Sequence, residues 1–80
     1  MPVADTTTLE IRAFWDEEAR VWVATSDDVP GLAAEADTLE ALVEKLKAII
    51  PELLALNRGF TDPIIPFHLV SERTEIARVS

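Results

Sequence analysis

The sequence predicts an α+β domain in the order β-β-β-α-β, with an antiparallel sheet and one kinked helix packed on one of its faces. Two patterns carry this prediction: polar and apolar residues alternate near the N-terminus, and apolar residues later recur at three- and four-residue spacing. A β-rich segment after the helix supplies the fourth strand. At 80 residues, the chain is expected to form a single domain over residues 8–80, preceded by a flexible N-terminus at residues 1–7.

The first two strands are predicted at residues 8–15 and 20–25, with an acidic turn between them. In the first segment Leu9, Ile11 and Ala13 alternate with polar residues, which is the period of a half-buried strand. The second segment is dense in β-branched and aromatic residues, which favour strands. An antiparallel hairpin is therefore expected.

The register of this hairpin decides which side chains share a face. A four-residue loop over residues 16–19 places Phe14 opposite Val21. The same register places Arg12 opposite Val23, on the same face. With the helix on the other face, these four side chains form a candidate surface for another chain. A register shifted by one residue is the alternative, and it would exchange the two faces.

A tight turn is expected after the second strand, where Asp27 and Asp28 can bond their own backbone. Pro30 presets its φ angle, and Gly31 accepts the positive φ that other residues resist. A short third strand is expected after this turn, at residues 32–36.

The helix is predicted to begin at Asp37 or Thr38, since either side chain can cap its first turn. Asp37 with Glu40 three residues later fits a capping box, and Glu40 suits the positive N-terminus of a helix. The apolar stripe continues past Pro51, which predicts one kinked helix; two helices, with Pro51 opening the second, are the alternative. Gly59 is placed to end the helix.

Two β-rich blocks follow the helix, at residues 64–70 and 74–79. Pro66 cannot donate to a ladder, so this strand lies at an edge of the sheet or contains a bulge. One long bent strand is favoured over a second hairpin, because Glu72 and Arg73 are poor residues for a tight turn.

The composition favours a role in recognition. The formal charge of −8, from 15 acidic against 7 basic residues, repels a phosphate backbone and favours a basic partner. A chain this short buries little surface, and without cysteine no disulfide supports it, so a homo-oligomer is expected. The sequence shows neither a signal peptide nor a membrane span, so a cytoplasmic protein is expected.

No catalytic, cofactor-binding or metal site is predicted. His68 is the only histidine, and no cysteine joins it in a metal site or a nucleophilic pair. The acidic clusters fall at opposite ends of the second strand, too far apart for one cation. They are instead candidates to face a partner: Asp16, Glu17, Glu18, Asp27 and Asp28.

From Trp22 to Leu42 the chain resembles the HicB-like antitoxin superfamily. The resemblance rests on an aromatic residue, an alanine, a DVPG turn and a Thr-x-Glu helix start: Trp22, Ala24, Asp28, Val29, Pro30, Gly31, Thr38 and Glu40. The chain is most similar to the short, stand-alone, uncharacterised members, which carry a domain of unknown function. The segments shared with them are residues 14–16, 28–32, 36–42, 51–54 and 67–70.

The resemblance implies a fold similar to the double-stranded-RNA-binding domain and a small basic toxin as partner. Full-length antitoxins of this kind often carry a separate DNA-binding segment, and none is expected here. Three positions depart from the family pattern: Leu32 is often cysteine, Ala36 is usually glycine, and Ala41 is commonly a second glutamate. The departures bear on toxin pairing and leave the fold prediction unchanged.

We therefore expect a non-enzymatic interaction domain that self-associates, as a dimer or a larger oligomer, and binds a small basic toxin. One alternative is a small-molecule-binding or regulatory module at the acidic turn. The other is an RNA-binding relic of the fold, which the net charge disfavours. No membrane partner is expected.

Overall fold

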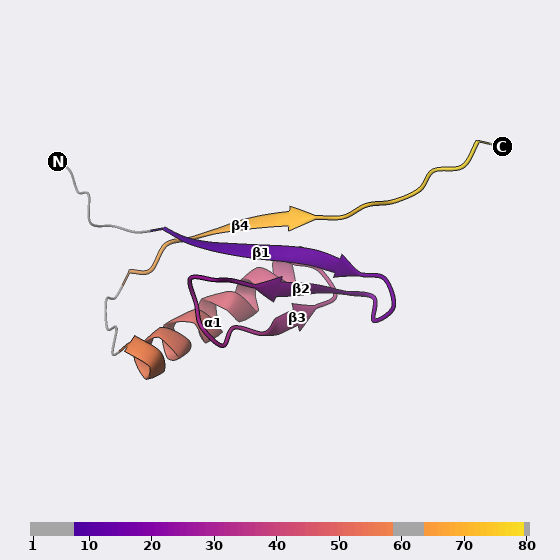
Figure 1. The fold of residues 1–80 in the computed structure, drawn as a ribbon. Coiled ribbons are helices and arrows are strands. Elements are labelled where there is room, and N and C mark those ends of the chain that lie inside the picture. The colour runs from indigo at the N-terminus through magenta and orange to yellow at the C-terminus, as the bar shows by residue number, and fades with distance from the viewer. Residues whose placement is uncertain (1–7, 59–63, 80) are drawn as a thin grey trace.

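The computed structural model describes residues 8–58 and 64–79, and it contains the predicted elements in the predicted order (Figure 1). They are β1 (Leu9–Asp16), β2 (Val21–Thr25), β3 (Ala34–Ala36), α1 (Leu39–Arg58) and β4 (Phe67–Glu72). The strands form one sheet with α1 against one face, so the α+β prediction is confirmed. The predictions made for residues 1–7 and for Gly59 lie outside the described residues.

The sheet is mixed, with the strand order β3-β2-β1-β4. The pairs β1–β2 and β2–β3 are antiparallel, whereas β4 runs parallel to β1. The expectation of an entirely antiparallel sheet is therefore wrong for β4. The helix is the reason: it carries the chain back along the sheet, so that β4 starts at the same end as β1 and runs in the same direction (Figure 1).

The β1–β2 register differs from the expected one by two residues. Phe14 pairs with Val23, and Asp16 pairs with Val21, because the loop covers residues 17–20 and starts one residue later than expected. Side chains of a strand alternate with a period of two, so a shift by two residues leaves each of them on its expected face. The alternative register, shifted by one, is wrong.

Asp16 sets the position of this loop. Its Oδ1 accepts hydrogen bonds from the backbone N–H groups of Glu18 and Ala19, at 3.0 and 3.1 Å. The N–H of Arg20 donates to the Asp16 carbonyl at 2.7 Å, and Arg20 itself adopts a φ of 61°, in the left-handed region. The loop therefore closes around a side chain that remains part of β1.

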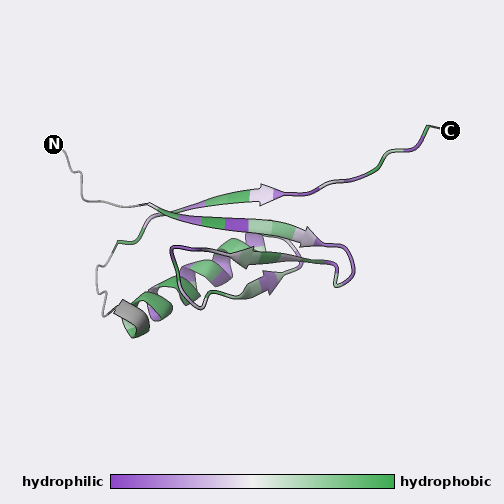
Figure 2. Ribbon diagram, viewed as in Figure 1, coloured by the Kyte–Doolittle hydropathy of each residue, from purple (hydrophilic) through white to green (hydrophobic). Residues whose placement is uncertain are grey.

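One face of the sheet and the inner side of α1 form the core. Figure 2 shows hydrophobic and hydrophilic bands along β1. The buried residues of this strand are Leu9, Ile11 and Ala13, which lie on the helix side. The helix packs against β3 and β2, whose inward side chains are largely alanines and allow a close approach. The buried apolar residues are Leu9, Ile11, Ala13, Trp22, Ala24, Val29, Leu32, Ala34, Ala36, Leu42, Leu46, Ile50 and Leu54.

Thr38 is the cap of α1, because its Oγ1 accepts the N–H of Ala41 at 3.0 Å. The capping box expected from Asp37 and Glu40 is therefore wrong, since the helix starts one residue later than that box requires.

The helix continues through Pro51, so the two-helix alternative is wrong as well. Pro51 lies on the exposed side, where water can reach the carbonyl that loses its donor. Among the described residues, no helix has the length and apolar character to cross a membrane.

The turn before β3 is longer than expected, and the strand is shorter. The N–H of Leu32 donates to the carbonyl of Val29 at 3.1 Å, so the turn includes Leu32 and β3 starts at Ala34. Gly31 adopts a φ of 84°, as its place in the turn predicts. Val29 and Leu32 are both buried, which anchors the turn in the core.

The final strand is an edge strand, as Pro66 predicts. The carbonyl of Pro66 accepts the N–H of Leu9 at 3.1 Å, and β4 starts at the next residue. No hairpin follows β4 within residues 73–79, so the chain continues as one segment. The predicted long strand is correct only as far as Glu72, however, because residues 73–79 belong to no ladder and run beyond the rest of the domain (Figure 1).

Candidate protein-interaction surface

The face of the sheet that points away from α1, which we call the outer face, is partly apolar. Along β1, Glu10, Arg12 and Phe14 are exposed, whereas Ile11 and Ala13 between them are buried on the helix side. The alternation follows from the pleat of the strand. No element of the described chain covers this face (Figure 1).

The strand registers align a row of side chains across the outer face. Phe14 pairs with Val23 on β2 and with Glu72 on β4. Val23 in turn pairs with Glu35 on β3. The row therefore crosses the whole sheet in the order carboxylate, valine, phenylalanine, carboxylate.

We call Phe14, Val21, Val23 and Val70 the outer patch. Phe14 is 44% exposed, and the three valines are half-buried. Arg12, which pairs with Val70, lies in the next row along β1. Complete burial of a valine or phenylalanine side chain is worth about 1.5–3 kcal/mol, so covering this patch would be favourable.

The structure brings together the four side chains predicted to share a surface, Arg12, Phe14, Val21 and Val23. Val70 was not among them. It joins the patch because β4 pairs with β1, and no local pattern in the sequence announces a partner so far along the chain.

Carboxylates surround the outer patch. Glu35 and Glu72 lie at the two ends of the central row, and Glu18 lies in the hairpin loop. Within the described chain no side-chain ion pair engages any of these three. They are therefore free to bind cationic groups of a partner.

The other acids of the hairpin serve the fold. Asp16 holds its own loop, as described above. Glu17 accepts the Nε1–H of Trp15 and an N–H of the Arg20 guanidinium, both at 2.9 Å. Of the three acids predicted to face a partner at this end of the hairpin, Glu18 is thus the one without such a role.

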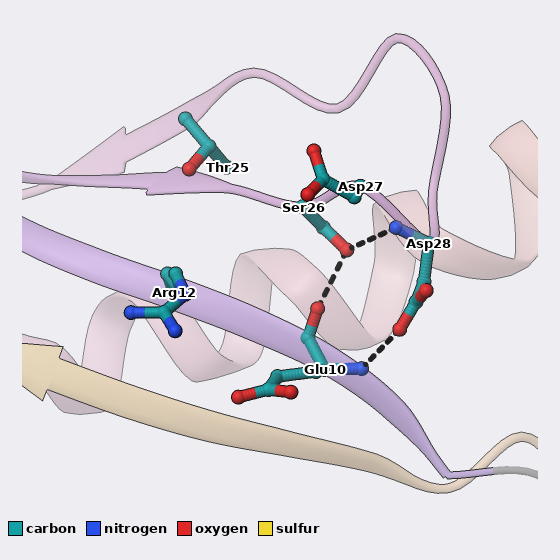
Figure 3. Close-up of a pocket in the computed structure, with 6 residues that line it drawn as sticks. All are labelled: Glu10, Arg12, Thr25, Ser26, Asp27 and Asp28. Carbon is teal, nitrogen blue, oxygen red and sulfur yellow. Dashed lines mark hydrogen bonds between the residues drawn. The ribbon is translucent and has the colours of Figure 1, made fainter.

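At the other end of β2, the turn and the start of β1 form a shallow pocket of about 220 Å³ (Figure 3). Its lining is polar: Glu10, Arg12, Thr25, Ser26, Asp27 and Asp28.

Two side chains of this pocket continue the β1–β2 pairing. Asp28 Oδ2 accepts the N–H of Glu10 at 2.8 Å, and Ser26 Oγ donates to the Glu10 carbonyl at 2.6 Å (Figure 3). Ser26 Oγ also accepts the N–H of Asp28, at 3.0 Å. Asp28, predicted to face a partner, is therefore half-buried and bound to β1, whereas Asp27 beside it is exposed.

An arginine–tryptophan cluster was not predicted. The rings of Trp15 and Trp22 meet edge to face, with centroids 5.5 Å apart. The guanidinium of Arg73 lies 4.0 Å from the ring centroid of Trp15, and that of Arg20 lies 5.7 Å from it. The sequence shows Arg20 near the aromatics, but Arg73 reaches them only because β4 lies beside β1.

His68 is exposed on the outer face, where it pairs with Glu10 of β1. Among the residues that the structure describes, no three histidine, cysteine or acidic side chains are grouped so as to hold a metal ion. Besides this histidine, the outer face presents apolar and charged side chains.

Similarity to known proteins extends over nearly the whole chain. The model of a family described as Domain of unknown function (DUF1902) matches residues 8–80. A crystal structure of the hypothetical protein TTHA1013, from the extremely thermophilic bacterium Thermus thermophilus, is 49% identical in sequence. The match covers 91% of this chain and 100% of that one, with a TM-score of 0.69. No curated protein matches the chain.

Proposed function

The chain belongs to the family described as Domain of unknown function (DUF1902), and from its surface we propose a non-enzymatic protein-interaction domain of the HicB-like antitoxin type. In this proposal the outer patch and its carboxylates bind a small basic protein, and the chain also self-associates. The observation that carries it is the row in which Phe14 and Val23 lie between two carboxylates.

An apolar centre with a charged rim is the usual layout of a protein interface. Phe14 is the natural anchor, because it is aromatic, exposed, and borne by a strand that is paired on both sides. The strands hold the patch in place before a partner arrives, which lowers the entropic cost of binding. Arg12 adds donors for a carbonyl or carboxylate of the partner.

The charge of the chain selects the partner. With a formal charge of −8, the domain attracts a basic protein and speeds its encounter. Glu18, Glu35 and Glu72 can then pair with lysine or arginine side chains around the apolar centre. Such pairs are exposed, so the binding is expected to weaken as salt is added.

The proposal is tested by calorimetric titration with any small basic protein that is encoded beside the gene, at two salt concentrations. Phe14→Ser is expected to weaken binding at least tenfold, which is about 1.4 kcal/mol. Glu35→Gln combined with Glu72→Gln is expected to weaken it less and to flatten the salt dependence, since two exposed charges are lost.

Matched controls lie on α1, on the other side of the sheet. Leu56→Ser replaces a side chain that is 82% exposed, and Glu44→Gln with Glu52→Gln removes the same charge as the test pair. Equal weakening by test and control variants would show that the partner does not use the outer patch. If no small basic protein is encoded there, or if it fails to bind at micromolar concentration, the antitoxin part of the proposal is wrong.

A second candidate function is small-molecule binding, and the observation that supports it is the pocket in Figure 3. Asp27 and Arg12 give the pocket opposite charges, which suits a small zwitterion. Its volume is below the ~300 Å³ at which ligand pockets usually begin, so only a small ligand fits. Thermal shift with free amino acids tests it: a stabilisation that Asp27→Asn abolishes supports this candidate.

The third alternative, RNA binding, is opposed by the carboxylates of the outer face.

A further inference from the structure

The last described residues, 73–79, form an extended segment that we call the C-terminal arm (Figure 1). The molecule is elongated, with extents of 55, 29 and 19 Å. Its radius of gyration is 15.1 Å, whereas a compact chain of this length has about 12 Å. The arm contributes to this elongation, because it runs beyond the domain that precedes it (Figure 1).

The arm has the composition of a strand. Its sequence, RTEIARV, contains three β-branched residues, Thr74, Ile76 and Val79. Ile76 is 80% exposed, and Val79 is fully exposed. An extended, unpaired segment with exposed apolar side chains is a ready template for pairing with another strand.

The base of the arm is fixed. Arg73 stacks on Trp15, with its guanidinium 4.0 Å from the ring centroid, and its Nε donates to the carboxylate of Glu75. These contacts direct the arm away from the sheet, in line with β4. A segment already held in an extended direction loses less entropy when it pairs.

The outer edge of β4 is the complementary surface. The strand is last in the order β3-β2-β1-β4, so its second edge has no partner in the described chain. It spans six residues, Phe67–Glu72, against seven in the arm, whereas β3 at the opposite edge spans three. The lengths of the arm and of this edge therefore agree to within one residue.

The inner side of β4 also lacks cover. The helix packs against β3 and β2, and it leaves Ile65, Phe67 and Leu69 only half-buried at the margin of the core. A further strand beside β4 would bring new side chains to this margin.

We propose that the C-terminal arm pairs antiparallel with the β4 edge of a second copy, and that the two copies exchange arms around a two-fold axis. Each β4 and its arm then run alongside the same segment of the other copy, and the two sheets become one sheet of eight strands. The inference rests on the self-association part of the proposed function and names the surface that carries it.

The pleat decides which side chains meet. A two-fold axis normal to the sheet pairs residues whose numbers are both odd or both even, and keeps both helices on one side. Odd-numbered Ala77 and Val79 then join Phe67 and Leu69 on the helix side. Even-numbered Ile76 joins Val70 on the outer face, so that the two outer patches become continuous.

The charges agree with this pairing. The arm contains Arg73, Arg78 and Glu75, so its formal charge is +1. The formal charge of the whole chain is −8, and the rest of the chain therefore has a charge of −9. The exchange therefore places a basic segment on an acidic sheet. In particular, it brings Arg78 to the end of β4 that pairs with Glu10.

Light scattering after size-exclusion tests the proposal. The full chain is expected to have twice its formula mass at micromolar concentration, and a chain ending at Arg73 is expected to be a monomer with the same circular dichroism. Ile76→Glu should weaken the dimer at least tenfold. Leu56→Glu is the matched control, because Leu56 is 82% exposed on α1, and it should leave the dimer unchanged.

Cysteine pairs locate the contact, since the chain contains no cysteine of its own. Ile76→Cys is combined in turn with His68→Cys, Val70→Cys or Glu72→Cys. One of these pairs is expected to give a disulfide-linked dimer on mild oxidation, because facing strands bring their Cβ atoms close enough for a disulfide. The failure of all three would overturn the exchange.

The outcomes separate the two proposals. A full chain that stays monomeric at high micromolar concentration removes both the arm exchange and self-association. A dimer that survives deletion of residues 74–80 removes the arm exchange alone. Binding of the basic protein is measured independently, and its failure leaves the arm exchange standing.

Discussion

The two halves of the sheet differ in how completely the chain covers them. β3 and β2 lie under α1, and their inward side chains Ala24, Ala34 and Ala36 are buried. At the other side, β4 has an open edge, and its inward Phe67 and Leu69 are half-buried. The difference shows where a domain of 80 residues leaves apolar groups uncovered: one half of the sheet is covered by the helix, and the other half has an open edge and half-buried apolar side chains.

The largest expected effect compares two leucines, one from each half. Leu46 is fully buried in α1, so Leu46→Ala should lower the free energy of unfolding by about 2–5 kcal/mol. Leu69→Ala on β4 removes a half-buried side chain and should cost roughly 1–2 kcal/mol at low protein concentration. Urea denaturation measures both, with unchanged m-values as the control. Equal losses would contradict the comparison.

A smaller effect tests the hydrogen bonds that join the start of β1 to the turn after β2. Asp28→Ala removes the acceptor of the Glu10 N–H and should cost about 1–3 kcal/mol. Asp27→Ala is the control, because Asp27 is exposed, and its effect should stay within about 0.5 kcal/mol. Thermal denaturation distinguishes them, and an equal loss from Asp27→Ala would show that Asp28 has no special role in the fold.

The smallest expected effect is a gain in stability from a substitution in α1, the helix that covers β3 and β2. Thr38 caps α1 through the N–H of Ala41, so Ala41→Glu completes a capping box and should add about 0.5–1 kcal/mol to the free energy of unfolding. Ala48→Glu makes the same replacement at an exposed position inside the helix and should be nearly neutral. Neither variant should change the oligomeric state, since both lie on α1. A stability gain from Ala48→Glu as large as that from Ala41→Glu would rule out capping as the cause.

The faces of the hairpin could be predicted from the sequence because they depend on a local property. Leu9, Ile11 and Ala13 alternate with polar residues, and alternation assigns a face to Phe14 whatever the register. The register itself depends on where the loop closes. That position is set by hydrogen bonds to Asp16 Oδ1, and neighbouring acidic residues would have been equally plausible acceptors.

The helix start shows the same limit, since Asp37 and Thr38 are both good caps and only the geometry chooses Thr38. The candidate site was predictable where it depends on the hairpin and unpredictable where it depends on β4. Val70 joins the outer patch only because β4 pairs with β1, a strand far away in the sequence. Arg73 reaches the ring of Trp15 for the same reason.

The parallel pairing of β1 and β4 also constrains the order in which the molecule can be made. Every pair of this ladder joins residues 58 positions apart, as Leu9 and Phe67 are, so one edge of β1 stays open until β4 has left the ribosome. Contacts so distant in sequence form slowly compared with a hairpin or a helix. A nascent chain that pauses after α1 therefore presents the edge of a central strand to its neighbours, and synthesis past β4 is what removes this aggregation hazard.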